Sequence, residues 1–357
     1  TDELIRMAHD MDDKPPKREM DMLLTIGEQM SVSLMAMVMH KLGVPAVSLN
    51  AFQVTMHTTS SHQNARLKRI DTERIRRELD ARRIVIVTGF QGVDKYDDYT
   101  TLGRGGSDTT AVALAAALHA DACEIYTDVD GVYTADPRKV PNARKLKEIT
   151  YDEMLDLATS GAGVLHNRSV EMAKKYGVPL VVRSSLNNSE GTVVKEVVSV
   201  ERMLISGVAL DTDAVRIAVL GLRDVPGVAF KVFDTLAKKN INVDVILQSI
   251  GRAGTKDISF TVNKDDLDDA VATLEESQER LGFKELHSER NIAKLSIVGS
   301  GMLSNPGVAA KMFESLYNEG VNINMISTSE IRITVLINEK DGIRAMNAVH
   351  DAFGLAD

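Results

Sequence analysis

The stretch Ile84-Val-Ile-Val-Thr88 is nearly all apolar and β-branched, and it runs directly into Gly89-Phe-Gln-Gly92. Strands of this composition are typical of parallel sheets covered on both sides, so we expect this one to be buried on both faces. Helix-like and strand-like segments alternate around it up to about Ser185. The expected helices cover residues 19–42, 71–79 and 108–120, and the expected strands cover residues 44–49, 123–127 and 179–183. This alternation predicts a three-layer αβα domain.

The helix expected over residues 19–42 has apolar residues at helical spacing and stops at Gly43. Its apolar positions are Met22, Leu23, Ile26, Met30 and Leu34. We expect this face to pack inward, with the methionines of the segment as flexible core filling. Glu28 follows Gly27 in this helix, and two interpretations stay open. The carboxylate is either solvated one step round the helix, or buried and in need of a partner.

Beyond the polar, turn-forming stretch Ser185-Leu-Asn-Asn-Ser-Glu-Gly191, the sequence repeats itself. Pro226-Gly-Val-Ala229 returns 80 residues later as Pro306-Gly-Val-Ala309. The same offset pairs Ile217 with Ile297, Gly221 with Gly301, Lys231 with Lys311, Phe233 with Phe313, Leu236 with Leu316, Asn242 with Asn322 and Ile246 with Ile326. Each copy reads as strand, Pro-Gly loop, helix, strand, strand, helix. The pattern predicts a duplicated α+β module with helices on one face of an antiparallel sheet.

Composition narrows the class of protein. The 357 residues suffice for two or three domains, and 44% apolar and 26% charged residues exclude bulk disorder. The net charge of −9 argues against nucleic acid or an anionic membrane as a partner. No apolar run approaches the ~20 residues of a membrane-spanning helix. The single cysteine, Cys123, forms no internal disulfide and favours the cytoplasm.

The densest candidate site is the glycine-rich turn Thr101-Leu-Gly-Arg-Gly-Gly-Ser-Asp108, which leads into an alanine-rich helix. Glycines let the backbone approach a ligand, and free N–H groups at a helix start favour an anion. The Arg104 guanidinium suits a carboxylate or a phosphate. The same residues also suit a plain turn with Ser107 or Asp108 as the helix cap. The spacing matches neither a Walker loop nor a dinucleotide-binding fingerprint.

A second candidate site is Thr127-Asp-Val-Asp-Gly-Val-Tyr-Thr-Ala-Asp-Pro-Arg138, directly after an expected strand. Its acids, hydroxyls, tyrosine and arginine leave the carboxyl end of that strand, where open α/β sheets bind ligands. The alternative is a hairpin turn at Asp130-Gly131 with solvated acids. The glycine is not placed for a calcium loop, and His57, His62 and His166 lack the spacing of zinc ligands. We therefore expect no metal site formed by protein side chains.

Together these stretches resemble the aspartokinases, amino-acid kinases that carry a tandem pair of ACT domains. The matching signatures are Leu24-Thr-Ile-Gly-Glu28, Gly89-Phe-Gln-Gly92, the turn ending at Asp108, the stretch ending at Arg138, and Ile326-Ser-Thr-Ser-Glu-Ile331. The resemblance covers essentially the whole chain. It implies a three-layer αβα kinase domain over residues 1–190 and two α+β ferredoxin-like ACT domains over residues 205–285 and 286–357. It also implies transfer of the γ-phosphoryl group of MgATP to the side-chain carboxylate of L-aspartate, giving 4-phospho-L-aspartate, the first step of lysine, threonine and methionine synthesis.

The resemblance also implies roles for single residues. Glu28 would hold the ammonium group of aspartate and Arg104 its α-carboxylate, with Asp108 organising charge beside them. The turn around the substrate would consist of Gly105, Gly106 and Ser107. The nucleotide would be lined by Thr127, Asp128, Tyr133, Arg138, Gly163 and Val164, and Mg²⁺ would be held mainly by its phosphates. A carboxylate is already a nucleophile, so catalysis would rest on alignment and on cations.

This family begins with a strand and a Lys-Phe-Gly-Gly-Thr-Ser turn, whose lysine contacts the transferred phosphates. No such turn occurs in this sequence, and we expect a strand-turn-helix unit before Thr1 to be missing from the recorded chain. An alternative from another class is therefore a non-catalytic amino-acid sensor, in which the kinase half is a scaffold. A glutamate kinase fits the ACT pair and the Ile326 signature less well. The family also usually has proline at Asn167, near the Gly163 segment.

ACT pairs of this family bind end-product amino acids. The resemblance therefore implies feedback inhibition by lysine, threonine or both, in a homodimer or a larger homo-oligomer. The effector contacts would be Asp224, Gly227, Ala229, Asn242, Val243, Asp244 and Gln248 in the first copy, and Asn305, Gly307, Val308, Asn322, Ile323 and Asn324 in the second. The helix starts after the Pro-Gly loops would receive an α-carboxylate. Alternatively, both loops are plain helix starts and the repeat serves only dimerisation.

Overall fold

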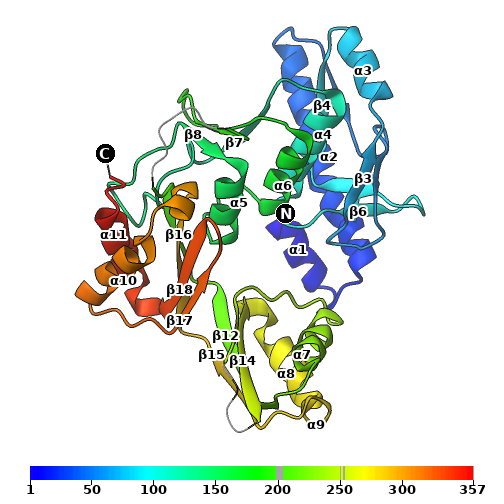
Figure 1. Ribbon diagram of the computed structural model, residues 1–357. Helices are drawn as coiled ribbons and strands as arrows, with labels where there is room; N and C mark the ends of the chain where they lie inside the picture. The colour runs from blue at the N-terminus through cyan, green and yellow to red at the C-terminus, as the bar shows by residue number, and fades with distance from the viewer. Residues whose placement is uncertain (198–203, 250, 252–253, 357) are drawn as a thin grey trace. The chain divides into compact units, whose positions relative to one another are not determined.

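The structure, a computed structural model, describes residues 1–197, 204–249, 251 and 254–356 (Figure 1). The chain divides into two compact units. The first unit comprises the described residues of Thr1–Gly131, Lys147–Tyr151 and Gly163–Val198. The second unit comprises those of Val132–Leu146, Asp152–Ala162 and Ser199–Asp357.

The first unit is mixed α/β. Its described helices are α1 (Asp2–His9), α2 (Lys17–Lys41), α3 (Glu73–Asp80), α4 (Gly106–Leu118) and α6 (Asn167–Tyr176). Its described strands are β1 (Ala46–Leu49), β2 (Met56–Thr58), β3 (Leu67–Ile70), β4 (Ile84–Val87), β5 (Gln91–Val93), β6 (Tyr99–Thr101), β7 (Cys123–Thr127), β8 (Glu148–Thr150), β9 (Leu180–Ser184) and β10 (Thr192–Lys195). They form sheets in the orders β1-β4, β3-β2-β5-β6 and β7-β9-β10-β8. The pairs β1–β4 and β7–β9 are parallel, as expected for strands that alternate with helices.

The apolar strand β4 forms where the sequence predicts it, but its burial differs. It pairs in register with β1, with Ile84 opposite Ala46 and Val87 opposite Leu49. The Ile84 side chain is 45% exposed, and residues 85–87 are only half-buried. The prediction of a strand buried on both faces is therefore wrong. Among the described residues β1 is the only strand that pairs with β4, so β4 is an edge strand of a two-stranded sheet rather than a central strand of a large one.

The long helix α2 reverses the predicted polarity. The apolar side chains of Met22, Ile26, Met30 and Leu34 are 48–62% exposed, whereas Asp21 and Thr25 are fully buried. The prediction that this apolar face packs inward is therefore wrong. The prediction that the methionines of the segment fill the core holds for Met20, which is 5% exposed, and fails for Met22 and Met30. Asp21, Thr25 and Glu28 recur every three to four residues, so they share one face of the helix. That inward face is polar because side chains and backbone groups from other segments bond to it.

The same helix is long and apolar enough to cross a membrane, with a mean hydropathy of 1.4 over an 18-residue window. Length and composition are the only grounds for this, and one such helix near the start of a chain is weak evidence. The prediction that no segment approaches the length of a membrane span is therefore wrong for α2.

The second unit contains two four-stranded antiparallel sheets, in the orders β13-β14-β12-β15 and β11-β16-β18-β17. Its described strands are β11 (Gly207–Asp211), β12 (Ala214–Arg223), β13 (Ile246–Gln248), β14 (Thr255–Asn263), β15 (Glu285–Glu289), β16 (Ile292–Val298), β17 (Met325–Thr328) and β18 (Arg332–Asn338). Its described helices are α5 (Tyr151–Thr159), α7 (Val228–Ala237), α8 (Leu267–Glu276), α9 (Gln278–Leu281), α10 (Val308–Asn318) and α11 (Gly342–Ala352), with short 3₁₀ turns at Lys264–Asp266, Ser300–Ser304 and Glu339–Asp341. Both copies show the predicted order strand, helix, strand, strand, helix, so the duplication is confirmed.

The fourth strand of each sheet comes from a different place in the chain. In the first copy β15 follows α8 and α9 and pairs with β12, with Arg216 opposite Glu289. In the second copy the fourth strand is β11, which precedes the first copy and pairs with β16. The first copy is thus inserted in the chain between two paired strands of the second copy's sheet. The domain limits at residues 205–285 and 286–357 stay a prediction, to which the pairing adds that β11 belongs with the second sheet.

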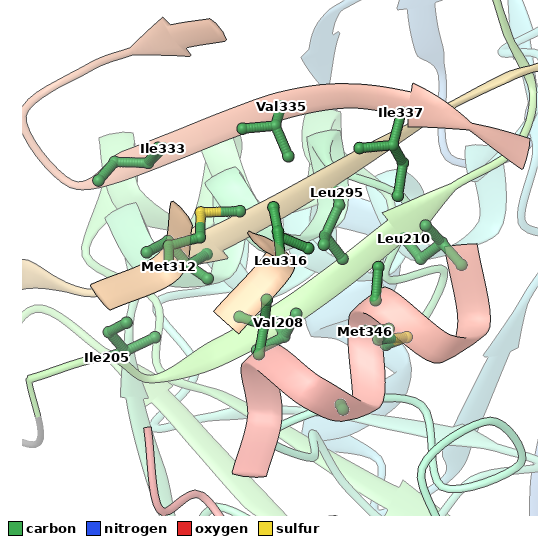
Figure 2. Close-up of a cluster of buried hydrophobic side chains, with 14 of the residues drawn as sticks. Ile205, Val208, Leu210, Leu295, Met312, Leu316, Ile333, Val335, Ile337 and Met346 are labelled. Atoms are coloured by element: carbon green, nitrogen blue, oxygen red, sulfur yellow. The ribbon is translucent and has the colours of Figure 1, made fainter. Parts of the chain in front are cut away.

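The core of the second copy gathers apolar side chains from both helices and the sheet (Figure 2). Leu210, Leu295 and Val335 come from three adjacent strands, and Met312 comes from α10 and Met346 from α11. Three buried side chains of the segment at residues 132–146 join the same core: Ala135, Val140 and Ala143. The chain after β7 therefore leaves the first unit and folds as part of the second.

Candidate active site

The glycine-rich turn ends where α4 begins. Gly105 caps this helix with a φ of +67°, in the left-handed region that favours glycine. A Cβ atom at this residue would lie 2.2 Å from the His166 side chain, just before α6. Glycine is therefore required for both the backbone conformation and the space. The turn packs closely on the start of α6, and the free N–H groups at the α4 start make it suitable for an anion.

The polar side chains of the turn have different surroundings. Arg104 is exposed and makes no ion pair with the described residues, and Ser107 is exposed too. Asp108 is half-buried, and burial raises its pKa, although the His166 backbone N–H acts in the opposite direction. Burial also lowers the pKa of the His166 imidazole, which favours its neutral form. The turn thus carries a guanidinium that makes no ion pair with the described residues and, four residues further along, a partly desolvated acid.

Glu28 lies on the inward polar face of α2. Its side chain is half-buried, and the described residues donate no hydrogen bond to its carboxylate. Burial raises its pKa. Of the two interpretations left open by the sequence, the structure thus favours a buried carboxylate that needs a partner. A cationic group bound beside it would recover the free energy lost to desolvation.

Asp21 lies outside the motifs recognised in the sequence. Its fully buried carboxylate accepts hydrogen bonds from the Thr101 hydroxyl (2.7 Å) and the Gln63 backbone N–H (3.1 Å). It therefore connects α2, which carries Glu28, to the strand end three residues before Arg104. An acid seven residues before Glu28 falls on the same helix face, and that spacing is the signal that would have identified it.

The predicted nucleotide residues at the end of β7 lie in the first unit. The Thr127 hydroxyl donates to the Asp128 carboxylate (3.1 Å), and the Thr127 carbonyl accepts from the Ser185 backbone N–H (2.8 Å). Asp128 and Gly163 are exposed, with open space around the position of a Cβ atom at Gly163, and Val164 is half-buried. The α6 helix begins at Asn167, and this first helical position would also accommodate the proline that is usual in the family.

The other two predicted nucleotide residues belong to the second unit. Tyr133 packs against the core of the second copy. The Arg138 guanidinium donates to the Asp136 carboxylate at 3.0 and 3.1 Å. Burial of Asp136 acts to raise the pKa of its carboxyl, but the bonds from Arg138 outweigh burial, so this pKa is lowered. The six residues are therefore divided between the units. Within the described residues, no group of three or more His, Cys, Asp or Glu side chains is placed to hold a metal ion.

The predicted effector residues all lie in the second unit. Gly227 and Gly307 start α7 and α10 with φ of +88° and +96°, so the two Pro-Gly loops have the same conformation. Asp224 pairs with Lys256 (2.8 Å), and Asp244 pairs with the buried Lys294 (2.6 Å). The remaining polar residues bond locally or are exposed. Asn305 bonds to the Gly301 carbonyl and Asn322 to Asn324, whereas Asn242 and Gln248 are exposed. The apolar ones, Ala229, Val243, Val308 and Ile323, contribute to the two cores.

Comparison with known proteins identifies related families. Residues 1–184 match the model of the amino acid kinase family, and residues 217–278 and 295–353 match that of an ACT domain. The chain is 52% identical over 358 residues to an aspartokinase of Geobacillus stearothermophilus, covering 100% of this chain and 87% of that protein. It is 50% identical over 357 residues to an aspartokinase of Bacillus sp. strain MGA3, with the same coverage.

Solved structures agree with these matches. Escherichia coli aspartokinase III in complex with aspartate and ADP is 28% identical and superposes with a TM-score of 0.84, covering 98% of this chain and 79% of that one. The same enzyme in complex with lysine and aspartate gives a TM-score of 0.74, covering 95% of this chain and 76% of that one. The predicted fold class, an α/β kinase domain followed by ACT domains, is confirmed.

Proposed function

The chain belongs to the aspartokinases, and on that premise we propose that it transfers the γ-phosphoryl group of MgATP to the side-chain carboxylate of L-aspartate. The observation that carries the proposal is that two groups of opposite charge lack a bonding partner among the described residues. Arg104 makes no ion pair, and the half-buried Glu28 accepts no hydrogen bond, among the described residues. A free α-amino acid supplies both missing partners, an α-carboxylate for Arg104 and an ammonium for Glu28.

The same geometry orients the substrate side chain. Arg104 sits in a turn held against α6, and Asp21 ties that turn to the helix that carries Glu28. Two fixed points on the amino-acid backbone leave the β-carboxylate with a defined direction, which lowers the entropic cost of reaching the transition state. The nucleophile is already ionised, so no general base is required. Asp108, whose pKa is raised by burial, would organise charge at the end of the turn.

The residues at the end of β7 fit a nucleotide. Thr127 and Asp128 supply a hydroxyl and a carboxylate at the carboxyl end of a strand. Gly163, shortly before α6 in the chain, has open space around the position of a Cβ atom. The α4 start offers N–H groups suited to phosphate oxygens. Bound MgATP supplies the transferred phosphoryl group, with Mg²⁺ held mainly by the phosphates. Phosphate and carboxylate oxygens are the hard ligands that Mg²⁺ prefers, so they are compatible with Mg²⁺ bound in this way.

We extend the proposal to regulation. The two ACT copies would bind lysine, threonine or both at the equivalent helix starts after Gly227 and Gly307, and the protein would act as a homodimer or a larger homo-oligomer in the cytoplasm. Support comes from the matching conformation of both loops and from the single cysteine of the chain. The lysine complex of Escherichia coli aspartokinase III is the precedent among solved structures.

A coupled assay for ADP release, run with aspartate, with glutamate or with no acceptor, tests the proposal. We expect turnover with aspartate alone, and inhibition when lysine or threonine is added. Arg104→Ala and Glu28→Ala should each raise the KM for aspartate, because each removes one charge-assisted contact of about 1.5–3 kcal/mol. Unchanged KM values in both variants would reject the site. Absence of turnover, together with a lysine- or threonine-dependent rise in melting temperature, would favour the alternative of a non-catalytic sensor.

A further inference from the structure

The loop that joins β2 to β3, residues 59–66, lies against the strand end that leads into the glycine-rich turn. The Ala65 backbone N–H donates to the Thr101 carbonyl (2.9 Å). Gly103 has a φ of +77°, and a Cβ atom there would lie 2.8 Å from the Gln63 carbonyl oxygen. The loop therefore forms a wall directly beside the residue before Arg104. None of the motifs of the sequence includes this loop.

A buried carboxylate fastens the loop from the side of α2. Asp21 is 0% exposed and accepts from the Thr101 hydroxyl (2.7 Å), from Nδ1 of His62 (2.9 Å) and from the Gln63 backbone N–H (3.1 Å). Two of these donors belong to the loop and one to the strand end. A carboxylate bonded to both segments at once fixes their separation, because moving either segment would take at least one donor away from a buried charge.

A guanidinium fastens the same two segments from the side of α6. Arg168 donates through one Nη atom to the Leu102 carbonyl (2.6 Å) and through the other to the Ala65 carbonyl (3.0 Å). A further contact reaches the Asn64 side chain (3.4 Å). The planar fork of arginine spans the two carbonyls, which a lysine ammonium on a flexible stem cannot reproduce.

From this convergence we propose that Asp21 and Arg168 are positioning residues that fix the Arg104 turn for the α-carboxylate of the amino-acid substrate. The inference rests on the proposed function, because it takes Arg104 as the group that binds this carboxylate. Asp21 also lies seven residues, or about 10 Å of helix rise, before Glu28 on the same face of α2. It therefore sets the turn relative to the second substrate contact as well.

The hydroxyl of Thr101 allows the sharpest test. Thr101→Val keeps the shape and removes the donor to Asp21, and Thr101→Ser keeps the donor. Thr100→Val is the matched control, because Thr100 is equally buried on β6 and bonds instead to Thr58 (2.6 Å). We expect Thr101→Val to raise the KM for aspartate about tenfold, with little change in the KM for ATP, because one bond to a charged group is lost. Thr101→Ser and Thr100→Val should leave the KM for aspartate within about twofold of the wild type.

Arg168→Lys tests the contacts that Arg168 makes to the Leu102 and Ala65 carbonyls. It keeps the positive charge and loses the two-carbonyl span, so the KM for aspartate should again rise about tenfold while that for ATP holds. Calorimetric titration of aspartate into each variant gives a readout independent of turnover. Equal effects of Thr101→Val and Thr100→Val, or an Arg168→Lys variant that binds aspartate normally, would overturn the inference. Arg104→Ala separates the two hypotheses: if it leaves aspartate binding unchanged, the proposed function of the site fails first.

Discussion

Replacing Lys294 by methionine removes the cation that joins the two ACT copies. The Lys294 ammonium is buried on β16 and lies 2.9 Å from the Asp211 carboxylate and 2.6 Å from that of Asp244. Asp211 ends β11 in the second sheet, whereas Asp244 lies in the predicted effector segment of the first copy. Methionine keeps the length of the side chain, so the substitution tests the charge rather than the packing.

Removing one partner of a buried ion pair costs about 3–5 kcal/mol, because the other charge is left uncompensated. Asp244 is partly exposed, so we expect the lower end of that range. For a unit of this size, each kcal/mol shifts the melting temperature by about 2–4 °C, so a loss of about 6–12 °C follows. Burial alone would lower the pKa of Lys294, but the two aspartates outweigh it and the pKa is raised. The stabilisation is therefore complete below the unfolded pKa of about 10.4 and disappears as the pH rises through the higher folded value.

Calorimetric melting of the wild type, Lys294→Met and Lys264→Met measures this difference. Lys264 pairs with Glu339 at 3.4 Å, with both side chains 38% exposed, so its loss should cost less than about 1 kcal/mol. Adding Asp211→Asn and Asp244→Asn to Lys294→Met should restore part of the stability, since no uncompensated charge then remains. A Lys294→Met variant that melts with the Lys264→Met control would refute the reasoning.

Three further outcomes are expected. Gly105→Ala should cost about 1–2 kcal/mol for the left-handed backbone, besides the overlap with His166, and should abolish aspartate binding in calorimetry; normal binding would contradict the turn geometry. Glu28→Gln should raise stability to urea at pH 7 and leave it unchanged near pH 3. The reason is that a carboxyl whose pKa is raised in the folded state stabilises the fold only while it is protonated. Equal effects of the substitution at both pH values would argue against desolvation as the cause of the raised pKa. Thr134→Val should destabilise the second unit by about 1–3 kcal/mol. The buried Thr134 hydroxyl bonds to His350 Nε2 (2.9 Å) and to the Leu355 carbonyl (3.1 Å), and valine loses both bonds. An unchanged melting temperature would contradict this expectation.

Local patterns in the sequence predicted the order of helices and strands well. The repeat of Pro226-Gly-Val-Ala229 as Pro306-Gly-Val-Ala309 predicted two like modules, and the structure shows them with the same strand order and the same loop conformation. The strand before Gly89 and the helix after the glycine-rich turn also form where expected. These features depend on residues close together in the chain, and short-range composition carries that information.

Burial and pairing between distant segments did not follow from the same patterns. Apolar spacing in α2 predicted a buried face, yet Met22 and Met30 are exposed. Asp21 is buried instead, and its carboxylate accepts hydrogen bonds from Gln63 and Thr101. In the same way, nothing near β11 indicates that its partner is β16, more than 80 residues further along.

The amino-acid sequence alone established the family, the duplicated modules and the two stretches that carry most of the proposed substrate and nucleotide contacts. Folding in three dimensions established which acid on α2 is fully bonded, which accepts no hydrogen bond from the described residues, and that Tyr133 and Arg138 belong to the second unit. The physical reason is that a hydrogen bond or a buried contact requires two partners, and the partner of a residue is set by the path of the whole chain.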